Sequence, residues 1–139
     1  MNDKYLKQLI KLAKKASKKK EVPISAIIVK DGKIISKAFN KRIKNNNVLD
    51  HAEIMAIRKA EKKLKDWRLF DCDLYVTLKP CSMCETIIKQ ARIKNVYYLL
   101  EKLNSKKDYN KTNFIKISEN EQMYYSILQD FFKKKRDKK

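Results

Sequence analysis

Three candidate metal ligands and one carboxylate lie in two short segments of the chain. Residues 51–53 (His-Ala-Glu) supply an imidazole and a carboxylate, and residues 80–84 (Pro-Cys-Ser-Met-Cys) supply two thiols. Zinc held by three nitrogen or sulfur ligands keeps a fourth tetrahedral position for water, whereas structural zinc usually takes all four ligands from protein. The spacing therefore predicts a catalytic zinc site.

Such a site suits hydrolytic deamination. A zinc-activated water attacks an amidine-like carbon, and Glu53 moves protons between the water and the leaving amine. A Cys-x-x-Cys pair by itself is also compatible with a redox pair or half of a structural zinc site. A four-ligand site would need Cys72, which we instead expect to be a partly buried free thiol at the entry to a strand.

The two segments are expected at helix starts. Asp50 is a plausible N-cap, and apolar residues at helical spacing predict a helix from His51 to about Lys65. His51 and Glu53 would point to nearly opposite sides of an ideal helix, so His51 must lie at its very beginning. Pro80 suits the start of a second helix, predicted from Cys81 to Arg92, in which positions i and i+3 share one face.

The remaining pattern is that of an α/β protein. Helices are predicted over 3–18 and 121–136, an Asp31-Gly32 hairpin joins strands 23–29 and 33–39, and further strands cover 74–78 and 95–100, with a weak one at 114–117. A helix between two strands implies a parallel crossover. The predicted buried stripes of the first and last helices are Leu6, Leu9, Ile10, Ala13 and Ala16, and Met123, Tyr124, Ile127, Leu128 and Phe131.

Length and charge bound the class of protein. The 139 residues suit a single domain (1–139), and 35 Lys and Arg against 16 Asp and Glu give a net charge of +19. Six of the seven residues 133–139 are basic. This charge indicates a polyanionic partner, unless a lysine-rich composition makes only a solvated surface. We expect no secretory signal and no membrane partner, and three cysteines without a disulfide pair indicate a cytoplasmic protein.

The chain resembles the zinc-dependent cytidine/deoxycytidylate deaminase superfamily, whose members carry the His-x-Glu and Pro-Cys-x-x-Cys signature. Within it the chain is similar to the bacterial tRNA-specific adenosine deaminases, which convert the wobble adenosine of an anticodon to inosine. The likeness covers most of the chain and rests on residues 21–24, 40, 51–56, 74–78, 80–84, 91–93 and 130–132, with the basic tail. The resemblance implies a three-layer α/β/α cytidine-deaminase-like fold with a central mixed sheet of about five strands.

The resemblance also implies the roles of the motif residues. His51, Cys81 and Cys84 would bind one Zn²⁺ per chain, and Glu53 would be the proton shuttle. Asn40 would hydrogen-bond the flipped base, although a turn residue that ends a strand is the alternative reading.

The resemblance further implies how the substrate would be held. Phe131 or Phe132 would stack on anticodon-loop nucleotides, although a core-facing pair on an amphipathic helix is an alternative, more so for Phe131. The implied partners are the anticodon stem-loop of a tRNA and a second copy of the chain, with no DNA expected.

One residue and one segment depart from the family pattern. Lys79 stands where the family usually has Glu before the proline of the second motif. The segment after the fourth strand usually carries an Arg-Asp pair and a small-residue-rich loop, whereas this chain has Leu100-Glu101 and a shorter Lys/Asn segment. Substrate contacts from that loop therefore cannot be transferred.

Three functions remain open. A tRNA wobble adenosine deaminase uses the zinc site, the base pocket and the positive charge together. A deaminase of a free base or nucleotide, of the guanine or deoxycytidylate type, leaves the charge without a use. A zinc-stabilised RNA-binding protein without catalysis leaves Glu53 without a role.

Overall fold

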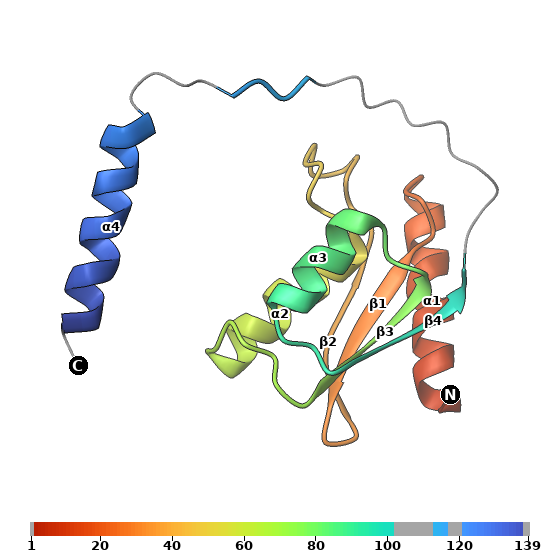
Figure 1. Ribbon diagram of the computed structural model, residues 1–139. Coiled ribbons are helices and arrows are strands. Elements are labelled where there is room, and N and C mark those ends of the chain that lie inside the picture. Colours follow the sequence, from red (N-terminus) through yellow and green to blue (C-terminus); the bar gives the residue numbers. More distant parts are fainter. Residues whose placement is uncertain (1, 102–112, 117–120, 138–139) are drawn as a thin grey trace. The chain divides into compact units, whose positions relative to one another are not determined.

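The computed structural model describes residues 2–101, 113–116 and 121–137 (Figure 1). They belong to two compact units, Met1–Ser105 and Lys106–Lys139. The first unit holds the sheet and three helices, and the second holds one helix. In the part of the chain that the structure describes, no helix combines the length and apolarity that a bilayer crossing requires.

Helix α1 spans Asp3–Lys18, as the sequence predicts, and buries Leu9 and Ala16 of the predicted stripe, but its buried face is shifted from the predicted one. The buried residues are Tyr5, Leu9, Leu12 and Ala16, while Ile10 of the predicted stripe is 40% exposed. The Tyr5 ring packs 4.9 Å from the ring of Tyr75, and its hydroxyl donates to the Gly32 carbonyl at 3.2 Å. This tyrosine fixes which face of the helix meets the sheet.

Strands β1 (Ser25–Lys30) and β2 (Lys33–Phe39) form the predicted antiparallel hairpin. Its two-residue turn places Asp31 at φ 52° and Gly32 at φ 75°. Positive φ at both central residues matches the right-handed twist of the flanking strands, and Asp-Gly is a favoured pair for such a turn. The only glycine in the chain therefore lies where the backbone requires it.

The first unit contains a mixed four-stranded sheet in the order β2-β1-β3-β4. Strand β3 (Cys72–Leu78) is antiparallel to β1, and β4 (Asn95–Leu100) is parallel to β3 across helix α3 (Ser82–Gln90), which confirms the crossover. The expectation of about five strands is wrong for the described residues. Residues 114–116 form no strand, and their Phe and Ile side chains are more than 80% exposed, so too few apolar residues gain burial there to support one. Residue 117 lies outside the described part.

Helices cover both faces of this sheet, as a three-layer α/β/α fold requires (Figure 1). On one face α1 packs on a core that includes Ile27, Val29 and Phe39. On the other face α2 (Ala52–Leu64) and α3 enclose a larger core around Ile28 and Leu74. Alternate residues of β1 thus enter opposite cores, so the central strand is buried on both sides.

The second unit contains helix α4 (Glu121–Asp137), close to the bounds predicted from the sequence. Its apolar stripe is present in the sequence but is not buried within this unit. The exposed side chains include Met123, Tyr124, Tyr125, Ile127, Phe131 and Phe132, each more than half exposed.

Candidate active site

The N-cap positions of two neighbouring helices hold the first two candidate ligands. His51 is the N-cap of α2 and Cys81 is the N-cap of α3, and both have extended backbone conformations. Neither side chain makes a capping hydrogen bond, whereas both carbonyls accept from the first helical turn, at 3.1 Å and 2.8 Å. The extended backbone at position 51 lets the imidazole turn toward α3, which resolves the opposed directions expected of His51 and Glu53.

The prediction that Asp50 caps α2 is wrong, because His51 takes that position. The buried Asp50 carboxylate instead accepts a hydrogen bond from Asn45 Nδ2 at 2.6 Å, and its other oxygen lies 3.8 Å from an Arg58 guanidinium nitrogen. The side chain therefore ties the preceding loop to α2 instead of ending the helix.

The three candidate ligands converge although they come from two distant segments. His51 Nδ1 lies 3.4 Å from Cys84 Sγ and 4.0 Å from Cys81 Sγ, and all three ligand atoms lie within 4.8 Å of one another. Tetrahedral zinc with ordinary bond lengths separates its sulfur and nitrogen ligands by roughly 3.6–3.8 Å. The donor types and their spacing thus fit a zinc ion with three protein ligands.

Glu53 completes this group from the first turn of α2, where it is 4% exposed. Burial raises the pKa of its carboxyl, and a hydrogen bond with Cys84 opposes that shift. Burial also raises the pKa of the Cys84 thiol strongly, and the negative charges of Glu53 and Cys81 add to the effect. Buried acidic groups this close are stable in their ionised forms only beside a cation, so the electrostatics match the ligand geometry.

Asn40, at the end of β2, lies against the same helix start. Its Oδ1 accepts a hydrogen bond from the backbone nitrogen of Ala52 at 2.7 Å, and the residue is 4% exposed. Because the Ala52 backbone N–H needs an acceptor, it is met by the amide oxygen, and the amide nitrogen of Asn40 points away from Ala52. Asn40 also lines an open hollow of about 660 Å³ on the side of the 40–50 loop. The amide is therefore held in an orientation that presents a hydrogen-bond donor.

The model of the MafB19-like deaminases matches residues 1–136, which is nearly the whole chain. The chain belongs to this deaminase family. The predicted resemblance is confirmed, and the His51, Cys81 and Cys84 group is placed in a family defined by deamination.

Curated relatives of this family member are named tRNA-specific adenosine deaminases. One from Streptococcus pyogenes serotype M18 is 44% identical over 94 residues, and one from Bacillus subtilis strain 168 is 45% identical over 94 residues. Both alignments cover 68% of this chain but only 59% and 58% of the relatives. The matched part thus spans less than two thirds of those proteins.

Two solved structures resemble the deaminase fold described above. A structure from a study of A-to-I editing by tRNA:A34 deaminases has a TM-score of 0.70 and 40% identity over 71% of this chain and 72% of that one. Guanine deaminase from Bacillus subtilis has a TM-score of 0.80 and 30% identity over 94% of this chain and 95% of that one. The structure from the tRNA:A34 deaminase study thus has the higher sequence identity, whereas the guanine deaminase structure matches a larger part of the chain.

One residue that orders the site of this deaminase family member was not assigned a role from the sequence. The Glu21 carboxylate is 6% exposed and accepts hydrogen bonds from the backbone nitrogens of Ile43 and Lys44, at 3.1 Å and 2.8 Å. It holds the loop between Asn40 and His51. In the sequence, the one sign of a role for Glu21 is its place directly before the Val-Pro that precedes β1. Its hydrogen-bond partners could not be predicted, because they depend on the path of the loop.

The remaining predicted residues lie apart from the ligand group or in the second unit. Cys72 is fully buried at the start of β3, more deeply than predicted, and is not among the clustered ligands of the described residues. Phe131 and Phe132 are 57% and 55% exposed on α4, with an edge-to-face contact of 5.4 Å between their rings. Neither ring is buried within its own unit.

Proposed function

We propose that this protein is a zinc-dependent deaminase that converts adenosine to inosine at the wobble position of a tRNA anticodon. Water and adenosine give inosine and ammonia. The observation that carries the proposal is the convergence of His51, Cys81 and Cys84 beside the buried Glu53. The naming of the relatives and the charge of +19 support tRNA as the substrate.

The proposed mechanism assigns one task to each group. His51, Cys81 and Cys84 hold Zn²⁺, which when bound makes water nucleophilic at neutral pH. Glu53 would accept the two protons of the attacking water in turn, passing one to the ring nitrogen and the other to the leaving amine. Its burial removes competing water and raises the pKa of its carboxyl, which suits a group that must both accept and release a proton.

Asn40 is proposed to read the flipped base. Its fixed amide would donate to an acceptor on the base, because its Oδ1 is already occupied by Ala52. A base removed from its stack loses a few kcal/mol of stacking and pairing, which such contacts and the surrounding pocket offset only in part.

A second candidate, guanine deamination, is favoured by one observation. The guanine deaminase structure matches 94% of the chain, including most of both units, whereas the tRNA:A34 deaminase structure matches 71%. This candidate uses the same ligands and Glu53 but gives the positive charge no role.

The two candidates are separated by one set of incubations. The zinc-loaded protein is mixed with a tRNA carrying A34, with free adenosine and with guanine, and inosine, xanthine and ammonia are measured. We expect inosine in the tRNA reaction and neither product from the free compounds. Xanthine from guanine without inosine in tRNA would replace the proposed substrate by the second candidate.

The whole chain is proposed to act as one deaminase domain with a basic tail that holds tRNA. Deleting residues 133–139, which include six basic residues, should weaken tRNA binding and flatten its salt dependence, by roughly 0.7–0.9 of log–log slope for each lost phosphate contact. Zinc content should remain at the wild-type level. Unchanged affinity and slope would leave the tail without a role. The end of α1 and the two residues after it would then be the better RNA-binding candidates, through Lys14, Lys15, Lys18, Lys19 and Lys20.

We also propose that the protein is a cytoplasmic homodimer in which one subunit helps to shape the pocket of the other. The proposal of a dimer is supported by apolar side chains that each unit leaves exposed. They include Tyr97, Leu99 and Leu100 on β4 and the apolar side of α4. Light scattering combined with size exclusion should give twice the monomer mass of 16.6 kDa. An active protein that is entirely monomeric would exclude the shared pocket.

A further inference from the structure

Two lysines from separate parts of the sequence lie against one aromatic ring, and two further lysines act on one of them through their charge. Lys41 Nζ lies 5.0 Å from the centroid of the Phe39 ring, and Lys19 Nζ lies 5.6 Å from it, both within the range of a cation–π contact. Lys44 and Lys59 are near enough to act electrostatically on Lys41. We refer to Lys19, Lys41, Lys44 and Lys59 as the Phe39 cluster.

The lysines of this cluster act on one another as like charges. Burial lowers the pKa of the Lys41 ammonium, and Lys59, Lys44 and Lys19 lower it further. Asp50 acts in the opposite direction, but its carboxylate already accepts from Asn45 and faces Arg58. Like charges held together in this way favour binding of an anion.

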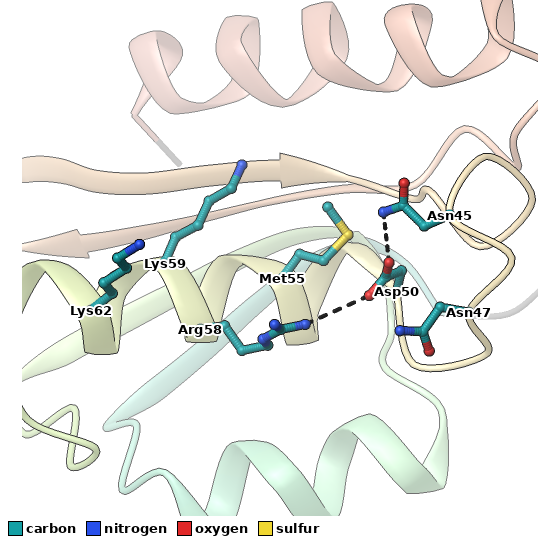
Figure 2. A pocket seen from close by; sticks show the side chains of 7 residues that line it. All are labelled: Asn45, Asn47, Asp50, Met55, Arg58, Lys59 and Lys62. Atoms are coloured by element: carbon teal, nitrogen blue, oxygen red, sulfur yellow. Dashed lines mark hydrogen bonds and ion pairs between the residues drawn. The ribbon is translucent and has the colours of Figure 1, made fainter.

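The protein holds the cluster in place through its backbone. Lys41 donates its backbone N–H to the Asp50 carbonyl at 3.0 Å, and Glu21 fixes the backbone of Lys44. Lys59 Nζ donates to the Lys37 carbonyl at 3.0 Å. Figure 2 shows Arg58 turned toward Asp50, while Lys59 extends from α2 in another direction. Lys59 thus contributes its charge without pairing with the acid that engages its neighbour.

One member of the cluster, Lys41, is linked directly to residues next to the candidate active site. Lys41 directly follows Asn40, and its backbone partner Asp50 directly precedes His51. A nucleotide whose base contacts Asn40 must place its phosphates close to the mouth of the pocket. Side chains that neutralise phosphates supply most of the affinity in such complexes, because base contacts are few.

We propose that the Phe39 cluster binds the phosphate backbone of the RNA strand that carries the target base. This inference rests on the proposed function and adds a phosphate subsite to it. The cluster also contacts β2, an edge strand, through the Phe39 ring and the Lys37 carbonyl, and lysines at sheet edges commonly prevent pairing with another sheet. If edge protection were the whole role, removing the charges would promote association of the protein and leave RNA binding unchanged.

The test compares two double variants of equal charge. Lys41→Gln/Lys59→Gln removes two cluster charges, and Lys7→Gln/Lys11→Gln removes two exposed charges on α1 outside the cluster. Anisotropy of a labelled anticodon hairpin is titrated at several salt concentrations. The cluster variant should lose roughly 1.4–1.8 of log–log slope and about tenfold in affinity near physiological salt. The control should lose less than half as much slope.

Zinc content and melting temperature show whether each variant is folded. If the first variant unfolds, Lys19→Gln/Lys44→Gln, which changes two exposed side chains of the cluster, repeats the test. A wild-type slope in the cluster variant overturns the inference. Equal losses in cluster and control variants also overturn it, because binding then follows overall charge alone.

The binding measurement is independent of turnover. Failure to form inosine, with RNA binding that still depends on the cluster, rejects the proposed function and keeps the phosphate subsite. A wild-type chain that does not bind RNA at all rejects both.

Discussion

Replacing Glu53 with glutamine is expected to lower kcat by roughly 10²–10⁴-fold, because the amide cannot accept and return a proton. The substitution keeps the size of the side chain at a position that is 4% exposed, so the fold should be retained. Glu53 is not among the clustered ligands, so zinc content and RNA affinity should match the wild type. Deamination of tRNA under saturating substrate is the measurement.

Glu85→Gln is the matched control for that variant. Glu85 lies in the first turn of α3, directly after Cys84, but is exposed and paired with Lys89 at 3.5 Å. It should keep nearly full activity, since surface ion pairs of this kind contribute little. Near-normal turnover by Glu53→Gln would remove this carboxylate from the mechanism.

Replacing Cys84 with alanine is expected to abolish both zinc binding and activity. The wild-type chain should hold one zinc, and loss of one of three protein ligands at a site that keeps an open position leaves too few to retain it. Cys81→Ala should behave in the same way. Elemental analysis of the purified variants, together with activity, gives the metal stoichiometry.

Cys72→Ala controls for the loss of a cysteine as such. Cys72 is fully buried like Cys84 but is not part of the ligand group, so this variant should keep its zinc even if its stability falls. Full zinc occupancy in Cys84→Ala, or metal loss in Cys72→Ala, would point to a different set of ligands.

The convergence of the three candidate ligands could be predicted from the sequence because the two motifs are local. Residues 51–53 and 80–84 each form one helix start, and the order strand, helix, strand brings the second of them to the end of β3. Hairpin residues Asp31 and Gly32 were likewise specific, since few pairs of residues tolerate two positive φ angles.

Other features depend on contacts that no local pattern records. The buried face of α1 is set by Tyr5, which finds Tyr75 and the Gly32 carbonyl far along the chain. Asp is a residue type that commonly caps helices, but the Asp50 carboxylate interacts with Asn45 and Arg58 instead. The Phe39 cluster and the hydrogen bonds that Glu21 accepts from the 40–50 loop likewise form only once that loop has folded.

The two departures from the family pattern lie side by side in the fold. Lys79 Nζ is 3.6 Å from Glu101 Oε1, and the Lys79 backbone nitrogen donates to the Leu100 carbonyl at 2.9 Å. These two contacts tie the residue before Pro80 to the end of β4. The side chains are 41% and 71% exposed, so the ion pair contributes little and the backbone hydrogen bond carries most of the connection. The connection therefore depends little on the charge at position 79, and an acidic residue there is expected to keep the same backbone path.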